Sequence, residues 1–74
     1  MKIVVYGPLK RTGILQGDDI VDIAGAYAKL LRERDGERNA AAVADALAPS
    51  DLGRLIEGGR RALDNTSAAL DYLA

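Results

Sequence analysis

Histidine and cysteine are both absent from the 74 residues. Without them the chain has no His-based acid–base catalyst, no Ser-His triad, no thiolate nucleophile and no typical zinc site. We therefore assign no catalytic, cofactor-binding or metal-binding residue, and expect the chain alone to have no enzymatic activity. The lack of cysteine is also compatible with a reducing cytoplasm.

The chain also has few aromatic residues and almost no net charge. The chain has three Tyr, no Phe or Trp, ten basic and eleven acidic residues, and a net charge of −1. A nucleic-acid-binding surface normally has a basic surplus and, for single strands, stacking aromatics. The apolar run Ile3–Tyr6 is too short for a signal peptide or a membrane span. We therefore expect a single small cytoplasmic domain over residues 1–74, with neither a nucleic-acid nor a membrane partner.

The segment Thr12–Ile23 predicts a β-hairpin with a two-residue turn at Gly17-Asp18. Gly17 supplies the positive φ that such a loop needs. The predicted register pairs four sets of residues, namely Gln16 with Asp19, Leu15 with Ile20, Ile14 with Val21, and Thr12 with Ile23. One face then carries Thr12, Ile14, Val21 and Ile23, and the other carries Leu15 and Ile20 with Gly13 and Asp22. The β-branched run Ile3–Tyr6, ending at Gly7-Pro8, adds a third strand.

After Ile23 the apolar spacing becomes helical. Ile23, Tyr27, Leu30 and Leu31 fall on one stripe, with Asp22 as N-cap and Asp35-Gly36 as the stop. Three more helices are expected. The first is short and capped by Asn39, and its inward residues are Ala40, Val43, Ala44 and Leu47. The second is capped by Ser50 and ended by Gly58-Gly59, with Leu52, Leu55 and Ile56 inward; the last starts at Arg60, and its apolar stripe consists of Ala62, Leu63, Thr66, Ala69, Leu70 and Leu73. The predicted class is α+β: a small three-stranded antiparallel sheet followed by about four helices, two of them short.

Two motifs resemble known ligand-binding patterns, one for phosphate and one for a metal ion, but neither has the residues that such a site requires. Between Gly7 and Gly13 lie five residues where a phosphate-binding loop has four, and no Lys-Ser/Thr pair or helix follows. The acidic cluster Asp18, Asp19 and Asp22 is explained by turn chemistry and helix capping, whereas Mg²⁺ or Ca²⁺ needs several converging oxygens. We therefore predict a plain turn and no metal site.

The remaining polar side chains also have structural explanations. Ser50 is expected to cap a helix, and Thr66 and Ser67 to be helix residues. The pair Arg60-Arg61 lies at a helix start, where its charge opposes the helix dipole. Either it is solvated, or it contacts a neighbouring domain.

Several segments resemble the N-terminal domain of the fumarylacetoacetate hydrolase family. They are Met1–Gly7, Thr12–Ile23, Ala24–Ala28, Leu47–Leu52 and Leu55–Gly59, followed by the Ala-rich final helix. The second is similar to that family's pattern of a Gly, two apolar residues, a Gly-Asp turn and a Val-Asp-Leu-like end. The match extends over essentially all 74 residues.

The resemblance implies a non-catalytic accessory or cap domain, or a fragment, of a larger enzyme. In that family a β-rich catalytic domain holds a divalent metal on acidic side chains, together with a His-Glu pair. It carries out metal-dependent carbon–carbon hydrolysis, decarboxylation or related chemistry. None of those motifs occurs here, so Mg or Mn is expected only in the missing catalytic domain. The expected partner is that domain or a second subunit.

A free-standing α+β protein-interaction module, with no enzymatic parent, is the alternative. Either function would use docking, because the sheet has apolar side chains on both faces and the short helices can cover only one. We expect an apolar patch on the opposite face or along the helix edges, and such patches usually mark partner sites. Self-association through the same patch is a further expectation.

Overall fold

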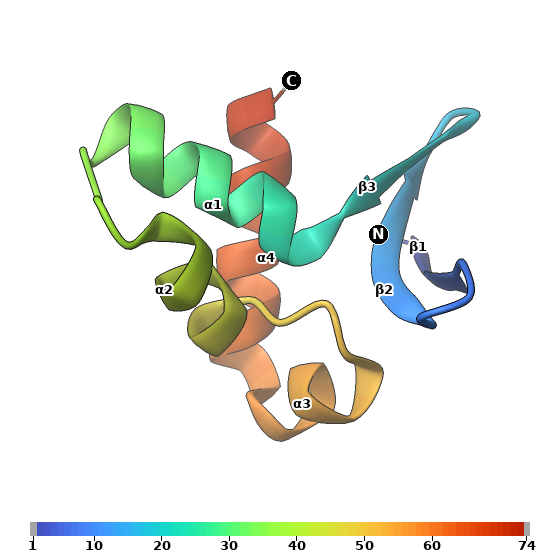
Figure 1. Ribbon diagram of the computed structural model, residues 1–74. Helices are drawn as coiled ribbons and strands as arrows, with labels where there is room; N and C mark the ends of the chain where they lie inside the picture. Colours follow the sequence, from blue (N-terminus) through green and yellow to red (C-terminus); the bar gives the residue numbers. More distant parts are fainter. Residues whose placement is uncertain (1, 74) are drawn as a thin grey trace.

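The computed structural model describes residues 2–73 as a three-stranded sheet followed by four helices (Figure 1). The strands are β1 (Lys2–Tyr6), β2 (Arg11–Gln16) and β3 (Asp19–Asp22). The helices are α1 (Ile23–Arg34), α2 (Ala40–Leu47), α3 (Leu52–Glu57) and α4 (Gly59–Leu73). The predicted α+β class and the order of its elements are confirmed.

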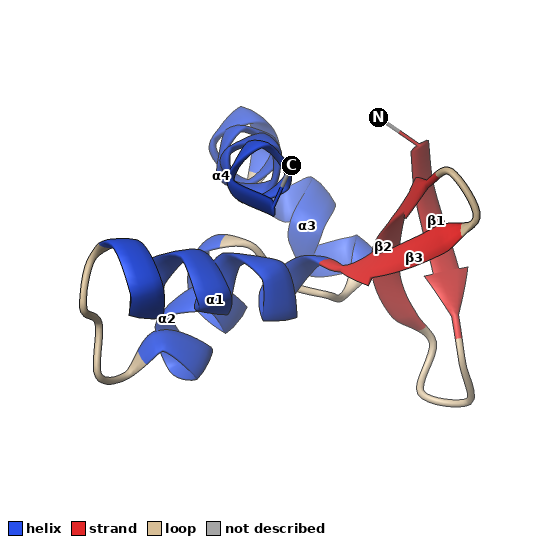
Figure 2. Cartoon of the chain, turned by 90° about the horizontal axis from the view of Figure 1, so that it is seen from above, coloured by secondary structure: helices blue, strands red, loops and turns tan. Residues whose placement is uncertain are grey.

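The sheet is antiparallel in the order β1-β2-β3 and lies at one end of the molecule (Figure 2). The hairpin register is as predicted for three pairs, Gln16 with Asp19, Leu15 with Ile20 and Ile14 with Val21. Gly17 has φ of 61°, whereas the φ of Asp18 is not positive. A positive φ at the first of the two loop residues only is typical of a type II′ turn. The turn placement is therefore confirmed.

The fourth predicted pair, Thr12 with Ile23, is wrong. β3 ends at Asp22 and Ile23 already begins α1, because the Asp22 side chain accepts a hydrogen bond from the Gly25 N–H and caps the helix. Thr12 instead donates its backbone N–H to the carbonyl of Ser50 at 3.0 Å. A residue that both ends the strand and caps the helix leaves no room for a longer hairpin.

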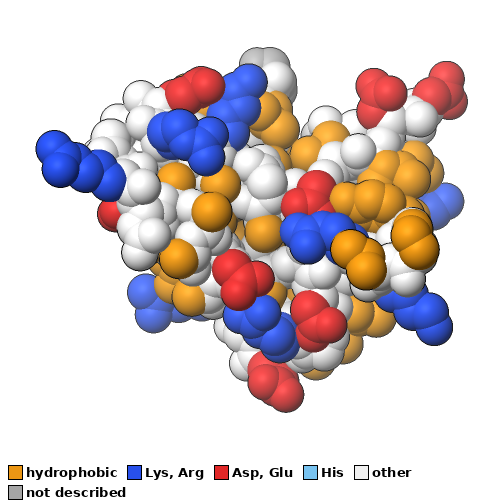
Figure 3. Space-filling model, in the orientation of Figure 1, with side chains coloured by type: hydrophobic (Ala, Val, Ile, Leu, Met, Phe, Trp, Pro, Cys, Tyr) orange, Lys and Arg blue, Asp and Glu red, His pale blue; other side chains and the backbone are white. Residues whose placement is uncertain are grey.

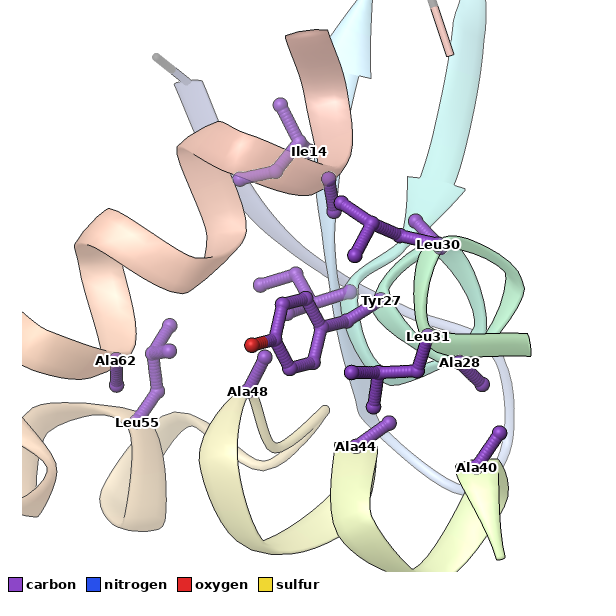
Figure 4. Packing of buried hydrophobic residues seen from close by; sticks show 13 residues of the cluster. Ile14, Tyr27, Ala28, Leu30, Leu31, Ala40, Ala44, Ala48, Leu55 and Ala62 are labelled. Atoms are coloured by element: carbon purple, nitrogen blue, oxygen red, sulfur yellow. The ribbon is translucent and has the colours of Figure 1, made fainter. Parts of the chain in front are cut away.

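The core is built around α1. Its predicted stripe is buried throughout, since the exposed fractions of Ile23, Tyr27, Leu30 and Leu31 are 1%, 8%, 0% and 7%. Figure 4 shows Tyr27, Leu30 and Leu31 within the cluster. α2 presents Ala40 and Ala44 toward α1, and small side chains of this kind let two helices approach closely.

The third helix differs from the prediction in two ways. Its N-cap is Asp51, whose carboxylate accepts from the Arg54 N–H at 2.9 Å. Ser50 caps α1 instead, since its Oγ accepts from the Ala24 N–H at 2.8 Å. Of its three predicted inward residues only Leu55 is buried, because six residues make too short a helix to be covered along its whole apolar face.

The final helix buries Ala62, Thr66 and Ala69 as predicted, and the Thr66 hydroxyl donates to the Ala62 carbonyl. Leu63 and Leu73, expected on the same stripe, remain 39% and 37% exposed. Within residues 2–73, no helix has the length and apolar character that crossing a membrane requires.

Candidate functional site

An apolar groove lies between β1, α3 and α4. It has a volume of about 220 Å³, and its lining consists of Ile3, Leu52, Leu55, Ile56, Gly59 and Leu63. Only Leu55 is fully buried; Ile3 and Leu52 are about 40% exposed, and Ile56 is 70% exposed. The groove is therefore a surface on which apolar side chains still face water.

Two glycines give the groove its shape. A Cβ on Gly58 would lie 2.7 Å from the Ala62 Cβ, so only glycine lets the end of α3 approach α4 this closely. Gly59 has φ of 60°, a conformation that favours glycine and redirects the chain into α4. The predicted Gly-Gly break thus sets the short α3 against the longer α4 and leaves Leu52 and Ile56 uncovered.

The expected apolar patch thus exists along the helix edges. The pattern did not identify its members, because Leu52 and Ile56 at helical spacing were assigned to the interior. The short length of this helix, between Asp51 and Gly58, could have indicated the exposed members, since six residues can bury only one or two side chains.

The outer face of the sheet carries a second, shallower apolar area. Ile20 is 47% exposed and Leu15 is half-buried, as predicted for the face that the helices do not cover. Tyr6 lies on this face over Gly13, where an added Cβ would meet the Tyr6 ring at 2.8 Å. Hydrophobic side chains accordingly gather over the sheet in Figure 3.

The polar residues of this face form a compact cluster around Asp22. Its Oδ1 accepts from the Tyr6 hydroxyl and from Arg11 Nε, both at 2.8 Å. Its Oδ2 accepts from Arg11 Nη2 at 2.9 Å and from the Gly25 N–H at 3.0 Å. Through Asp22, the sheet is joined to the first turn of α1.

These contacts determine the protonation of the cluster. Partial burial disfavours the ionised Asp22 carboxylate, but the hydrogen bonds from Arg11 and Tyr6 outweigh burial and hold its pKa well below the ordinary value. The Tyr6 pKa is raised by desolvation and by its bond to the same carboxylate. A carboxylate with so low a pKa is a poor proton acceptor near neutral pH, so the cluster is suited to holding structure and not to acid–base catalysis.

A hollow of about 230 Å³ adjoins this cluster, lined by Arg11, Asp22, Ala24, Gly25, Ala28, Ala41 and Asp45. Asp45 in turn is paired with Arg54, whose Nη1 lies 3.1 Å from Asp45 Oδ2. Because both carboxylates are already paired with arginines, the charges around the hollow are balanced within the chain.

The three aspartates of the acidic cluster do not converge. Asp22 is bound to Arg11, while Asp19 is exposed at the start of β3 and Asp18 occupies the turn. Among the described residues, no three His, Cys, Asp or Glu side chains come together in an arrangement able to hold a metal ion.

The Gly7–Gly13 segment is a turn followed by a strand. The Lys10 N–H donates to the Gly7 carbonyl at 3.1 Å, and β2 begins at Arg11. A strand at this point has no helix N-terminus to direct at a phosphate, consistent with the predicted plain turn. Arg60, the other charged candidate, is exposed, and its Nε lies 4.0 Å from Asp64 Oδ2 one turn along α4.

No family profile, curated protein or solved structure matches the chain.

Proposed function

We propose that this chain is a non-catalytic accessory domain of a fumarylacetoacetate hydrolase family enzyme. In this proposal a separate catalytic domain supplies the Mg²⁺ or Mn²⁺ site and the reacting groups for carbon–carbon hydrolysis, decarboxylation or related chemistry. This chain supplies a docking surface that helps to shape access to the active site.

The apolar groove is the observation that carries the proposal. Three of its side chains, Leu52, Ile56 and Leu63, are 39–70% exposed although they are large and aliphatic. Covering each of them removes apolar surface from water at about 25 cal/mol per Å². A domain attached to a larger enzyme gains this stabilisation from its neighbour.

The residues that carry the family resemblance also support it. Gly17 forms the hairpin turn, Gly13 makes room for Tyr6, and Asp22 joins the sheet to α1. Each of these positions serves the shape of the domain. Residues with structural roles of this kind are what a domain without reacting groups would require.

Finding a catalytic domain encoded in the same reading frame would be the most direct genetic support for this proposal.

A binding experiment tests the docking itself. When the catalytic domain is produced separately, its addition should raise the melting temperature of this chain, since a partner that binds only the folded state stabilises it. Ile56→Ser should weaken this stabilisation, because Ile56 lines the groove. Leu9→Ser is the matched control, since Leu9 is 81% exposed in the β1–β2 turn and lies outside the groove.

Stabilisation that is equal for both variants would place the docking site elsewhere. A reading frame without a catalytic domain would overturn the proposal and favour the free-standing interaction module, for which the same groove would receive another protein.

A further inference from the structure

The open backbone edge of β1 adjoins the groove, to which β1 contributes Ile3. β1 is an edge strand, and among residues 2–73 no backbone group outside the sheet bonds to it. Its sequence is Lys-Ile-Val-Val-Tyr, without a proline and with a charge only at Lys2. Natural edge strands usually carry charges, prolines or bulges that prevent pairing, so an unprotected β-branched edge invites a further strand.

The backbone hydrogen bonds show which groups face this edge. Thr12 is the partner of Val5, yet the Thr12 N–H donates to Ser50, so it points away from β1. Thr12 and Val5 therefore form a pair without backbone hydrogen bonds. Because such pairs alternate along an antiparallel ladder, Ile3 behaves in the same way as Val5. The N–H and C=O groups of Ile3 and Val5 thus point outward, while those of Val4 point toward β2.

This arrangement is self-complementary. When β1 meets a second β1 antiparallel with Val4 opposite Val4, each Ile3 lies opposite the other copy's Val5. Both residues have outward-facing N–H and C=O groups, so the two pairs exchange hydrogen bonds on either side of the two-fold axis. Their side chains lie on one face and form apolar cross-strand pairs, which are favourable. Lys2 falls opposite Tyr6, so no like charges meet.

We propose that this chain self-associates through β1, with a second copy of the chain as the occupant of the edge. The product is a continuous six-stranded sheet whose two-fold axis passes between the two Val4 residues. A stable interface of standard size buries about 800 Å² per partner, more than a five-residue ladder provides. The association is therefore weak and depends on concentration. The association uses the backbone edge of β1, and Ile3 is the one lining residue of the groove that also takes part in it.

Cysteine trapping tests the register directly, because the native chain contains no cysteine. In Val4→Cys the two thiols lie in a pair without backbone hydrogen bonds, where Cα atoms are about 4.5 Å apart and a disulfide fits. In Val5→Cys the thiols are offset by two residues from one another along the ladder. Oxidation should convert Val4→Cys largely to a covalent dimer and leave Val5→Cys largely monomeric. Equal cross-linking of the two variants would overturn the proposed register.

A proline substitution tests the hydrogen bonds. Val5→Pro removes an outward N–H that β2 does not use, so the β1–β2 ladder is retained, whereas Val5→Thr keeps the N–H and is the matched control. Sedimentation equilibrium should show concentration-dependent dimers for the native chain and for Val5→Thr, and monomers for Val5→Pro. Circular dichroism melting would identify a variant that has lost its fold.

Amide hydrogen exchange gives a readout that needs no variant. The Ile3 and Val5 amides should become protected as concentration rises, while the Val4 amide is protected throughout. A chain that stays monomeric up to its solubility limit, with Ile3 and Val5 exchanging freely, would refute self-association through β1. That result would leave the proposed docking of a catalytic domain untouched.

Discussion

Asp22→Ala should be among the most destabilising single changes at the surface of this protein. The Asp22 carboxylate caps α1 through the Gly25 N–H, and accepts the Tyr6 hydroxyl and two Arg11 nitrogens. This half-buried side chain thus connects β1, β2 and the first turn of α1. The substitution therefore removes three different contributions at once.

Each contribution has a known typical size. Loss of an N-cap costs about 1 kcal/mol. The hydrogen bond from the half-buried Tyr6 contributes about 1 kcal/mol. The ion pair with Arg11 is discounted to about 0.5 kcal/mol, because the Arg11 side chain is 45% exposed. The expected loss of about 2.5 kcal/mol corresponds to a melting temperature lower by about 10–20 °C for a domain of this size.

Asp22→Asn removes the charge and one of the two acceptor oxygens. The remaining oxygen can still cap α1, since Asn is as good an N-cap as Asp, but the new NH2 group faces the Tyr6 and Arg11 donors. Its cost should therefore be about 1.5 kcal/mol, the sum of the Tyr6 and Arg11 contributions. The depressed pKa of Asp22 means that its charge stabilises the fold above the unfolded-state pKa of about 4. This stabilisation is lost as the pH falls below that value.

Thermal and urea denaturation, followed by circular dichroism, measure both effects. The difference in unfolding free energy between the native chain and Asp22→Asn should be constant near neutral pH and shrink as the pH falls below about 4. A loss below about 1 kcal/mol for Asp22→Ala, no more than its N-cap contribution alone, would refute the argument. If the difference in unfolding free energy between the native chain and Asp22→Asn did not change with pH, the role assigned to the charge would be refuted.

Three further changes test individual elements. Gly13→Ala should cost about 1–3 kcal/mol, because the new Cβ would lie 2.8 Å from the Val21 carbonyl oxygen and the backbone must shift; a melt that matches the native chain would contradict this close approach. Ser50→Ala should cost about 1–2 kcal/mol by removing the partner of the Ala24 N–H, and hydrogen exchange at Ala24 should accelerate. Gly17→Val should cost about 1–3 kcal/mol, since a β-branched residue resists the φ of 61°; denaturation of the variant beside Asp18→Ala, which leaves Gly17 in place, isolates this effect.

Local patterns were sufficient to predict much of the fold. The Gly17-Asp18 turn, three pairs of the hairpin register and the buried stripe of α1 all depend on residues within a few positions of each other. Turn preferences, strand alternation and helical spacing act over such distances. For the same reason the number and order of the elements could be predicted.

Contacts between distant segments had no local signature. Ser50 was expected to cap the helix that follows it, but its hydroxyl caps α1, 26 residues earlier in the chain. Tyr6, Arg11 and Asp22 belong to three strands, and no periodicity indicates that they share a cluster. Which hydrogen-bonding group meets which partner depends on how the sheet and helices pack.

The candidate site shows the same division. The sequence alone determined that this chain lacks His and Cys, and that its short helices would leave apolar surface uncovered. Only the tertiary structure decided where that surface lies. Leu52, Leu55 and Ile56 have equivalent spacing, but the packing of α3 against α4 covers Leu55 and leaves the other two facing water. Burial depends on neighbours that folding brings together from distant parts of the chain, and the sequence of a single helix does not identify these neighbours.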